Sequence, residues 1–147
     1  MSESLLIIED EALLGREMQR RFIRQGWDAV IAGSLAEARQ QLLGEHLRPL
    51  VVLADMNLPD GNSLDLLAEL QTDDKAVGEW ILLTAYGTIP DSVRALQLGA
   101  HDFLEKPVDE ARLDLSVQRA ARSSRAQRRL SYAAASEAAK YHVEQFI

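Results

Sequence analysis

Short runs of mostly apolar residues alternate along the chain with segments in which apolar residues recur at helical spacing. The runs occupy residues 5–8, 29–32, 50–54, 80–83 and 101–104. Most lack polar alternation, which is typical of strands that are buried on both faces of a sheet. The intervening segments place apolar residues on one face, as Leu14, Met18 and Phe22 do at intervals of four. The sequence therefore predicts a strand–helix unit that is repeated five times.

Capping residues and glycines mark where the predicted helices begin and end. Ser34, with Glu37 three residues later, forms a capping-box pattern at the start of one helix. Gly26 and Gly99 follow two of the helices and are expected to end them. The other predicted N-terminal caps are either Asn62 or Ser63, then Thr88 and Asp109.

Strands that are joined through helices form a parallel sheet, which helices cover on both faces. Right-handed crossovers leave few topologies for such a chain. We predict an α/β, flavodoxin-like, doubly wound fold with five parallel strands in the order 2-1-3-4-5 and an extended C-terminal helix. In this topology the switch point lies between the first and third strands. Ligands of such sheets bind there, beside the carboxyl ends of the strands.

The composition is that of an ordinary globular protein of 147 residues, which is one domain or one domain with an appendage. No apolar run approaches the roughly 20 residues of a membrane span, and the acidic N-terminus does not resemble a targeting peptide. The chain has no cysteine, which excludes disulfides and thiolate ligands and fits a cytoplasmic location. The net charge of −7 argues against a general nucleic-acid-binding surface.

Carboxylates end two of the predicted strands. Asp55 follows the apolar run 50–54, and Glu9 and Asp10 follow the run 5–8. The predicted topology brings these three side chains into one cleft, where their repulsion would require a cation. All-oxygen ligation is what Mg²⁺ prefers, so we predict a magnesium site. Taken singly, Asp55 could be a helix cap or a loop residue, and the Glu-Asp pair could favour a helix N-terminus.

Two further strand ends supply a hydroxyl and an ammonium group. Thr84 follows the run 80–83, and Lys106 lies just beyond the run 101–104. Carboxylates, a hydroxyl, a lysine and a hard cation together are typical of a phosphoryl-transfer site. Asp55 would be the nucleophile and would form an acyl phosphate. Each residue alone could be an ordinary strand-end or surface residue, but packing requirements do not account for the whole set.

Residues 4–122 resemble the receiver domain of two-component response regulators. The resemblance is carried by Ile8-Glu9-Asp10-Glu11 and by residues 53–61, 83–87 and 99–107. It implies that a sensor histidine kinase phosphorylates Asp55. It also implies that Asp10, Asp55 and the backbone carbonyl of Asn57 bind Mg²⁺, with Glu9 acting through water.

The same resemblance implies a cis peptide bond before Pro107, which would direct Lys106 into the site. Two positions depart mildly from the family pattern. The acidic pair is Glu-Asp where Asp-Asp is also common, and Ala54 precedes Asp55. Neither departure removes a group that the chemistry needs.

The resemblance further implies how phosphorylation would alter the surface. In receivers the hydroxyl at the Thr84 position moves together with an aromatic residue on the last strand, here Phe103. We hypothesise that these two residues repack the surface formed by the fourth helix, the fifth strand and the fifth helix. The alternative is that Phe103 is an ordinary core aromatic residue. The family positions that tune loss of the phosphoryl group are Asn57 and Tyr86 here, and Tyr86 is bulky enough to shield it.

The C-terminal segment differs in composition from the rest of the chain. Arginines cluster between Arg119 and Arg129, alanines follow, and no proline or glycine occurs after Glu110. These residues favour a helix that runs well past residue 122, with a break near Ser123 as an alternative. An apolar stripe that suits packing on a partner helix consists of Leu130, Ala134, Ala138 and Tyr141. We divide the chain into a receiver domain, residues 1–122, and a helical linker or dimerisation segment, residues 123–147.

The run 84–88 and the long helix resemble those of sigma-54-dependent activators. In such regulators an AAA+ ATPase and a DNA-binding domain would follow, and we expect this chain to be the N-terminal part of one. The arginines show no helix-turn-helix pattern and no interleaved aromatic residues, so no direct nucleic-acid binding is expected from this segment. The expected partners are a sensor histidine kinase and a second copy of the chain.

Three classes of function fit the site to different degrees. A phosphorylation-gated switch that controls transcription fits best. A hydrolase with an aspartyl-phosphate intermediate usually carries a second acid two residues after the nucleophile, where this chain has Asn57. A phosphorylation-independent dimerisation module would not need so crowded an anionic cleft. We therefore expect a switch that accepts and slowly loses its own phosphoryl group, and not a turnover enzyme.

Overall fold

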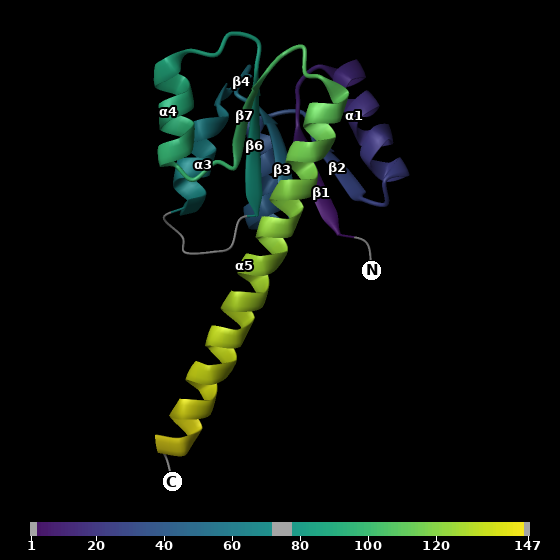
Figure 1. Cartoon of the computed structure of the whole chain (residues 1–147). Coiled ribbons are helices and arrows are strands. Elements are labelled where there is room, and N and C mark those ends of the chain that lie inside the picture. The colour runs from purple at the N-terminus through teal and green to yellow at the C-terminus, as the bar shows by residue number, and fades with distance from the viewer. Residues whose placement is uncertain (1–2, 72–77, 146–147) are drawn as a thin grey trace.

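Five parallel strands form a single sheet in the order β2-β1-β3-β6-β7 (Figure 1). The computed structural model describes residues 3–71 and 78–145, with side chains as far as residue 130. The strands are β1 (Ser4–Ile8), β2 (Asp28–Ala32), β3 (Val51–Asp55), β6 (Glu79–Thr84) and β7 (Asp102–Glu105). Counted along the chain, their order is 2-1-3-4-5, so the predicted topology is confirmed.

Helices cover both faces of this sheet (Figure 1). One face is covered by α1 (Ala12–Arg24) and α5 (Glu110–Gln145). The other is covered by α2 (Leu35–Arg39), α3 (Ser63–Gln71) and α4 (Ile89–Gln97). A π-helical turn, η1 (Gln40–Gly44), continues α2. The arrangement is the doubly wound sheet that alternating strands and helices predict.

The strands divide their side chains between two apolar clusters. In β1, Leu5 and Ile7 face the cluster under α1 and α5, whereas Leu6 and Ile8 face the other cluster. All four side chains are fully buried. Burial on both faces explains why the strand sequences are unbroken apolar runs.

Side-chain caps begin the helices largely where the sequence places them. Ser34 Oγ accepts a hydrogen bond from the Glu37 N–H at 3.1 Å. Asn62, not Ser63, caps α3, because Asn62 Oδ1 accepts from the Leu64 N–H at 2.8 Å. The remaining predicted caps, Thr88 and Asp109, also accept backbone hydrogen bonds, and Gly26 and Gly99 lie just past helix ends with φ of 97° and 84°.

The cap of α2 leads to a prediction about stability. Ser34→Ala should lower the free energy of unfolding by about 1 kcal/mol, because an N–H in the first turn loses its acceptor. Urea denaturation measures this difference. Ser34→Thr retains the acceptor oxygen and should keep most of the stability. Equal losses in the two variants would show that the hydrogen bond is not the cause.

Two local features differ from a simple interpretation of the sequence. The segment after β3, where no strand was predicted, contains a small antiparallel hairpin, β4 (Asn57–Leu58) with β5 (Gly61–Asn62). The apolar face expected on α4 exists, but it points outward: Ile89, Val93 and Leu96 are 80%, 45% and 63% exposed. The fully buried Ala95 makes the contact between α4 and the core instead.

Helix α5 runs without a break from the sheet into a long projecting arm (Figure 1). Beyond residue 122 it still contacts the body of the domain. Ser123 Oγ donates to Glu79 Oε1 at 3.1 Å, and Arg125 forms an ion pair with Glu3 at 2.5 Å. Further along, Arg128 Nη2 donates to the carbonyl oxygens of residues 48 and 49 at 2.9 and 3.0 Å. Within residues 123–130, where side chains are described, α5 is therefore joined to the body by Ser123, Arg125 and Arg128.

The apolar stripe predicted for the arm falls mostly outside the residues whose side chains are described. This applies to Ala134, Ala138 and Tyr141. Leu130, the first member of the stripe, is 70% exposed. Among the described helices, none combines the length and apolar character that crossing a bilayer requires.

Candidate functional site

Three carboxylates meet at the carboxyl ends of β1 and β3. Glu9 and Asp10 follow β1, and Asp55 ends β3. Each offers an oxygen that lies within 4.8 Å of the oxygens offered by the other two. Glu9 is buried, Asp55 is partly buried and Asp10 is exposed. The cluster that the topology predicted from separate strand ends is therefore formed.

Lys106 lies beside two of these carboxylates. Its Nζ is 3.2 Å from Asp55 Oδ2 and 3.3 Å from each Glu9 carboxylate oxygen. The backbone N–H of Lys106 donates to the Thr84 carbonyl at 2.7 Å, which ties the end of β7 to the end of β6. The peptide bond between Lys106 and Pro107 is cis, as the family resemblance implies.

Burial and charge act in opposite directions on this cluster. The pKa of the Glu9 carboxyl is raised to about 7, because burial, the largest cause, and the Asp55 carboxylate together outweigh the opposing effect of Lys106. Burial disfavours the charged form of Lys106, but the two carboxylates outweigh it and raise the pKa of Lys106 above its ordinary value. Three carboxylates and one ammonium group leave an excess of negative charge. A hard divalent cation bound by oxygens would neutralise that excess, so the donor set fits Mg²⁺.

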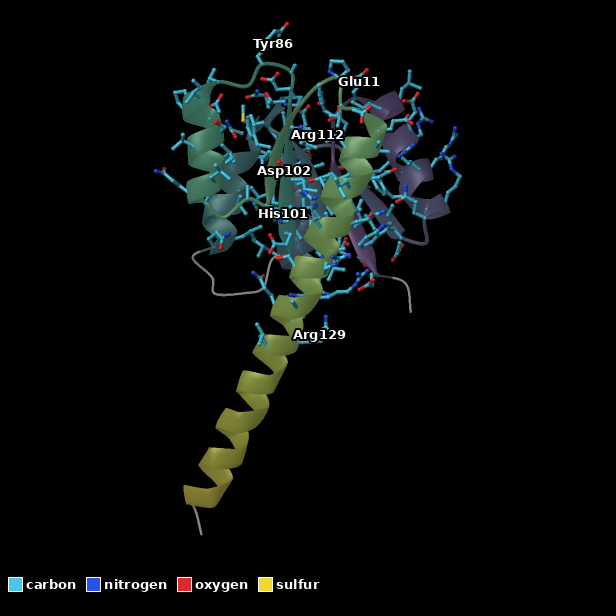
Figure 2. All side chains as sticks on the ribbon, in the orientation of Figure 1. Glu11, Tyr86, His101, Asp102, Arg112 and Arg129 are labelled. Carbon is cyan, nitrogen blue, oxygen red and sulfur yellow. The ribbon has the colours of Figure 1, made fainter. Side chains whose placement is uncertain are left out.

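The other predicted site residues surround this cluster. Thr84 is fully buried, and its Oγ1 accepts a hydrogen bond from the Tyr86 N–H at 3.2 Å. The Asn57 N–H lies 3.4 Å from Asp55 Oδ1. The Tyr86 side chain is 88% exposed and projects into solvent at the end of the domain that carries the site (Figure 2). In this conformation it lies open to solvent and does not form a closed cover over the site.

Phe103 lies on β7 and packs partly against the core. Gly87, in the loop after β6, approaches it closely: a methyl group placed on Gly87 would lie 2.9 Å from Phe103 Cε1 and 3.1 Å from Thr84 Cγ2. The absence of a side chain at Gly87 therefore leaves room for the aromatic ring beside Thr84. The predicted switch pair, Thr84 and Phe103, is brought together at this point.

Sequence reasoning missed two residues that shape the site. Gly87 is one of them. The other is the fully buried Ser63, whose Oγ donates a short hydrogen bond to the backbone carbonyl of Asp55. Its N–H also donates to the Met56 carbonyl at 2.9 Å. Ser63 was considered only as a cap, because nothing in the sequence indicates that its hydroxyl reaches back across the hairpin to β3.

Comparison with known proteins agrees with this geometry. Residues 5–118 match the family model described as "Response regulator receiver domain". The response regulator protein PilR of Pseudomonas aeruginosa is 36% identical over 111 residues, which are 76% of this chain and 24% of that protein. The chain thus spans about a quarter of the length of the first curated relatives it matches.

Solved receiver structures are also similar. A signal receiver domain from Vibrio parahaemolyticus has a TM-score of 0.80 and 25% identity, over 88% of this chain and 98% of that one. A response regulator from Burkholderia pseudomallei, with a phosphorylated aspartic acid, a calcium ion and citrate, has a TM-score of 0.70 and 25% identity, over 88% and 75%. The strand order, the acidic cluster and the family match lead to one conclusion: this chain belongs to the response regulator receiver domain family of two-component systems.

Proposed function

We propose that Asp55 accepts a phosphoryl group and that the resulting acyl phosphate switches the output surface of the domain. One observation carries this proposal: Lys106 Nζ lies within 3.3 Å of both Asp55 and Glu9, inside an acidic cluster at the strand ends. An oxygen of the Asp55 carboxylate would attack phosphorus. The bond between phosphorus and a histidine nitrogen of the kinase would break, and that nitrogen would keep the bonding electron pair.

The surrounding groups have separate roles in this step. Glu9, Asp10, Asp55 and the backbone carbonyl of Asn57 would hold Mg²⁺, directly or through water. Bound Mg²⁺ supplies positive charge that stabilises the phosphoryl oxygens. Lys106 adds a second positive charge beside Asp55. The Thr84 hydroxyl is the buried donor that would reach a phosphoryl oxygen and leave its present contact with the Tyr86 N–H.

Phosphorylation would then be communicated by Thr84 and Phe103. Thr84 is fully buried, so movement of its hydroxyl towards the phosphoryl group would change the packing around it. Phe103 lies next to it through Gly87 and borders the face formed by α4, β7 and α5. This face carries the exposed side chains Ile89, Val93 and Leu96. We propose that two copies of the chain pair through this face, with α5 extending the contact.

A groove between α1 and the segment that follows Lys106 is a candidate contact surface for the kinase. It has a volume of about 840 Å³ and is lined by Leu14, Met18, Arg21, Pro107 and Val108 together with Lys106. Its position beside Lys106 would allow a partner seated there to present a phosphohistidine to Asp55. The wider context is also proposed: a sigma-54-dependent activator, in which residues 1–122 receive the signal and residues 123–147 link it to an ATPase and a DNA-binding domain.

The proposal is tested with acetyl phosphate as the phosphoryl donor. Intact-mass measurement of the chain with acetyl phosphate and Mg²⁺ should show a single phosphate adduct. Replacing Mg²⁺ with EDTA should abolish the adduct, because the excess negative charge of Glu9, Asp10 and Asp55 would then oppose the approach of a phosphoryl group. Adduct formation at the same rate in EDTA would contradict the magnesium assignment.

The same experiment separates the switch from a hydrolase. Release of acetate should stop after about one equivalent per chain on the timescale of adduct formation, apart from slow loss of the acyl phosphate. Continued rapid release from acetyl phosphate, or turnover of small phosphomonoesters, would favour the hydrolase. A chain that forms no adduct under any condition would instead favour a phosphorylation-independent dimerisation module.

A further inference from the structure

Two hydroxyl groups on one face of α5 bind carboxylates at the amino-terminal ends of β6 and β7. Ser116 Oγ donates to Asp102 Oδ2 at 2.8 Å, and Ser123 Oγ donates to Glu79 Oε1 at 3.1 Å. The two serines are about two helical turns apart, so they lie on the same side of α5. Asp102 and its neighbour His101 lie where β7 passes beside this helix (Figure 2).

The first of these bridges involves the backbone next to the proposed switch residue. Asp102 Oδ1 accepts a hydrogen bond from the Phe103 N–H at 2.8 Å, while its other carboxylate oxygen accepts from Ser116. One carboxylate therefore binds the backbone of Phe103 and the side chain of α5 together. Ser116 is only 4% exposed, so this contact is well shielded from competing water.

The second bridge has a different position relative to the switch. Glu79 begins β6, whereas Thr84 ends it. Glu79 is buried, and His101 Nδ1 lies 3.8 Å from its other carboxylate oxygen. This bridge therefore attaches α5 to the end of β6 that is opposite Thr84. The hydrogen bond that the Phe103 N–H donates to a carboxylate goes to Asp102 and not to this bridge.

We propose that the Asp102–Ser116 bridge transmits the state of the Thr84–Phe103 pair to α5 and so to the arm that α5 extends from the domain. This inference rests on the proposed function, since it requires phosphorylation of Asp55. A change in the position of Phe103 moves its backbone N–H, which donates a hydrogen bond to Asp102. The Asp102 carboxylate then shifts with it and displaces Ser116. The Glu79–Ser123 bridge anchors α5 but does not carry the signal. Asp102 and Ser116 are thus positioning residues, and neither touches the phosphoryl group.

Hydrogen–deuterium exchange of α5 amides, with and without acetyl phosphate and Mg²⁺, tests this assignment. The quantity compared is the ratio of α5 exchange rates between the two states. In the parent chain, phosphorylation should change the exchange rates over residues 110–130, so that this ratio differs from one. Ser116→Ala should lose most of the change, while the phosphate adduct measured by intact mass stays at the parent level. Ser116→Thr retains the hydroxyl and should restore the change.

Ser123→Ala is the matched control, because it removes a hydroxyl from the same face of the same helix. It should raise α5 exchange in both states by a similar factor and leave the phosphorylation-dependent ratio intact. If Ser116→Ala also raises α5 exchange equally in both states and keeps the ratio, the Asp102–Ser116 bridge is purely structural and the proposal is overturned.

The remaining outcomes separate this inference from the function on which it rests. An adduct on the parent chain with no change anywhere in α5 would overturn the Asp102–Ser116 assignment and leave Asp55 as the phosphoacceptor. Absence of any adduct on the parent chain would instead overturn the proposed function, and the coupling with it. If Ser116→Ala does not fold, Asp102→Asn provides the second variant. It keeps one oxygen acceptor, and it should reduce the change in the exchange ratio without reducing the adduct.

Discussion

An Asp55→Asn variant is expected to form no phosphate adduct with acetyl phosphate and Mg²⁺. The amide has almost the shape of the carboxylate but lacks the negative oxygen that would attack phosphorus. The loss should be complete, because we assign the nucleophile to Asp55 alone. Glu9 and Asp10, the other carboxylates of the cluster, are assigned to Mg²⁺ binding. Intact-mass measurement under the conditions used for the parent chain gives the result directly.

Asp60→Asn is a matched control for this loss. Asp60 lies in the hairpin after β3, is exposed, and accepts hydrogen bonds from the N–H groups of Leu35 and Ala36 at 3.0 Å. It is outside the acidic cluster, so the variant should keep the full adduct. An adduct that persists in Asp55→Asn, or that disappears in Asp60→Asn, would contradict the assignment of Asp55.

A Thr84→Val variant is expected to keep the adduct but to lose the change in surface that follows it. Valine replaces the hydroxyl with a methyl group of similar size, so the fully buried position stays filled. The variant cannot donate a hydrogen bond to the phosphoryl group. The Tyr86 N–H also loses its acceptor, which should cost only about 1 kcal/mol of stability.

Two measurements on the same sample check this separation. Intact mass should show the adduct on the variant. Analytical ultracentrifugation should show that the phosphorylated parent chain pairs and that the phosphorylated variant does not. Thr84→Ser, which keeps the hydroxyl, should preserve both. A Thr84→Val chain that gives the full parent response would show that the hydroxyl does not couple the phosphoryl group to Phe103.

The strand order and the acidic cluster could be predicted because both follow from unbroken patterns in the sequence. Strands such as β1 are buried on both faces, so their apolar runs are evident without tertiary information. The alternation of strands and helices gives a parallel sheet and its strand order. In such a sheet the residues that end the strands must meet at one edge. Glu9 and Asp55 lie at the ends of the neighbouring strands β1 and β3, and Lys106, which follows β7 at the same edge of the sheet, contacts both carboxylates.

Other features could not be predicted because they depend on packing or on backbone groups. The apolar residues of α4 have the spacing of a core face, yet Ile89 and Leu96 are exposed while Ala95 fills the contact. Periodicity identifies a face of a helix, but it does not say which partner covers it. No contact with the domain was predicted for Arg128, but it binds the backbone carbonyls of residues 48 and 49. Because every residue carries a backbone carbonyl, the sequence does not indicate which ones an arginine will bind.

The contacts of α5 beyond residue 122 bear on how this receiver can be joined to foreign output modules. A chimera cut after residue 122 would discard Arg125 and leave Glu3 without its cation. It would also discard Ser123 and Arg128, which bind Glu79 and the backbone before β3. A junction placed after residue 130 retains all three attachments. Fusions made there should preserve the native angle between the sheet and whatever the helix carries, and earlier junctions should not.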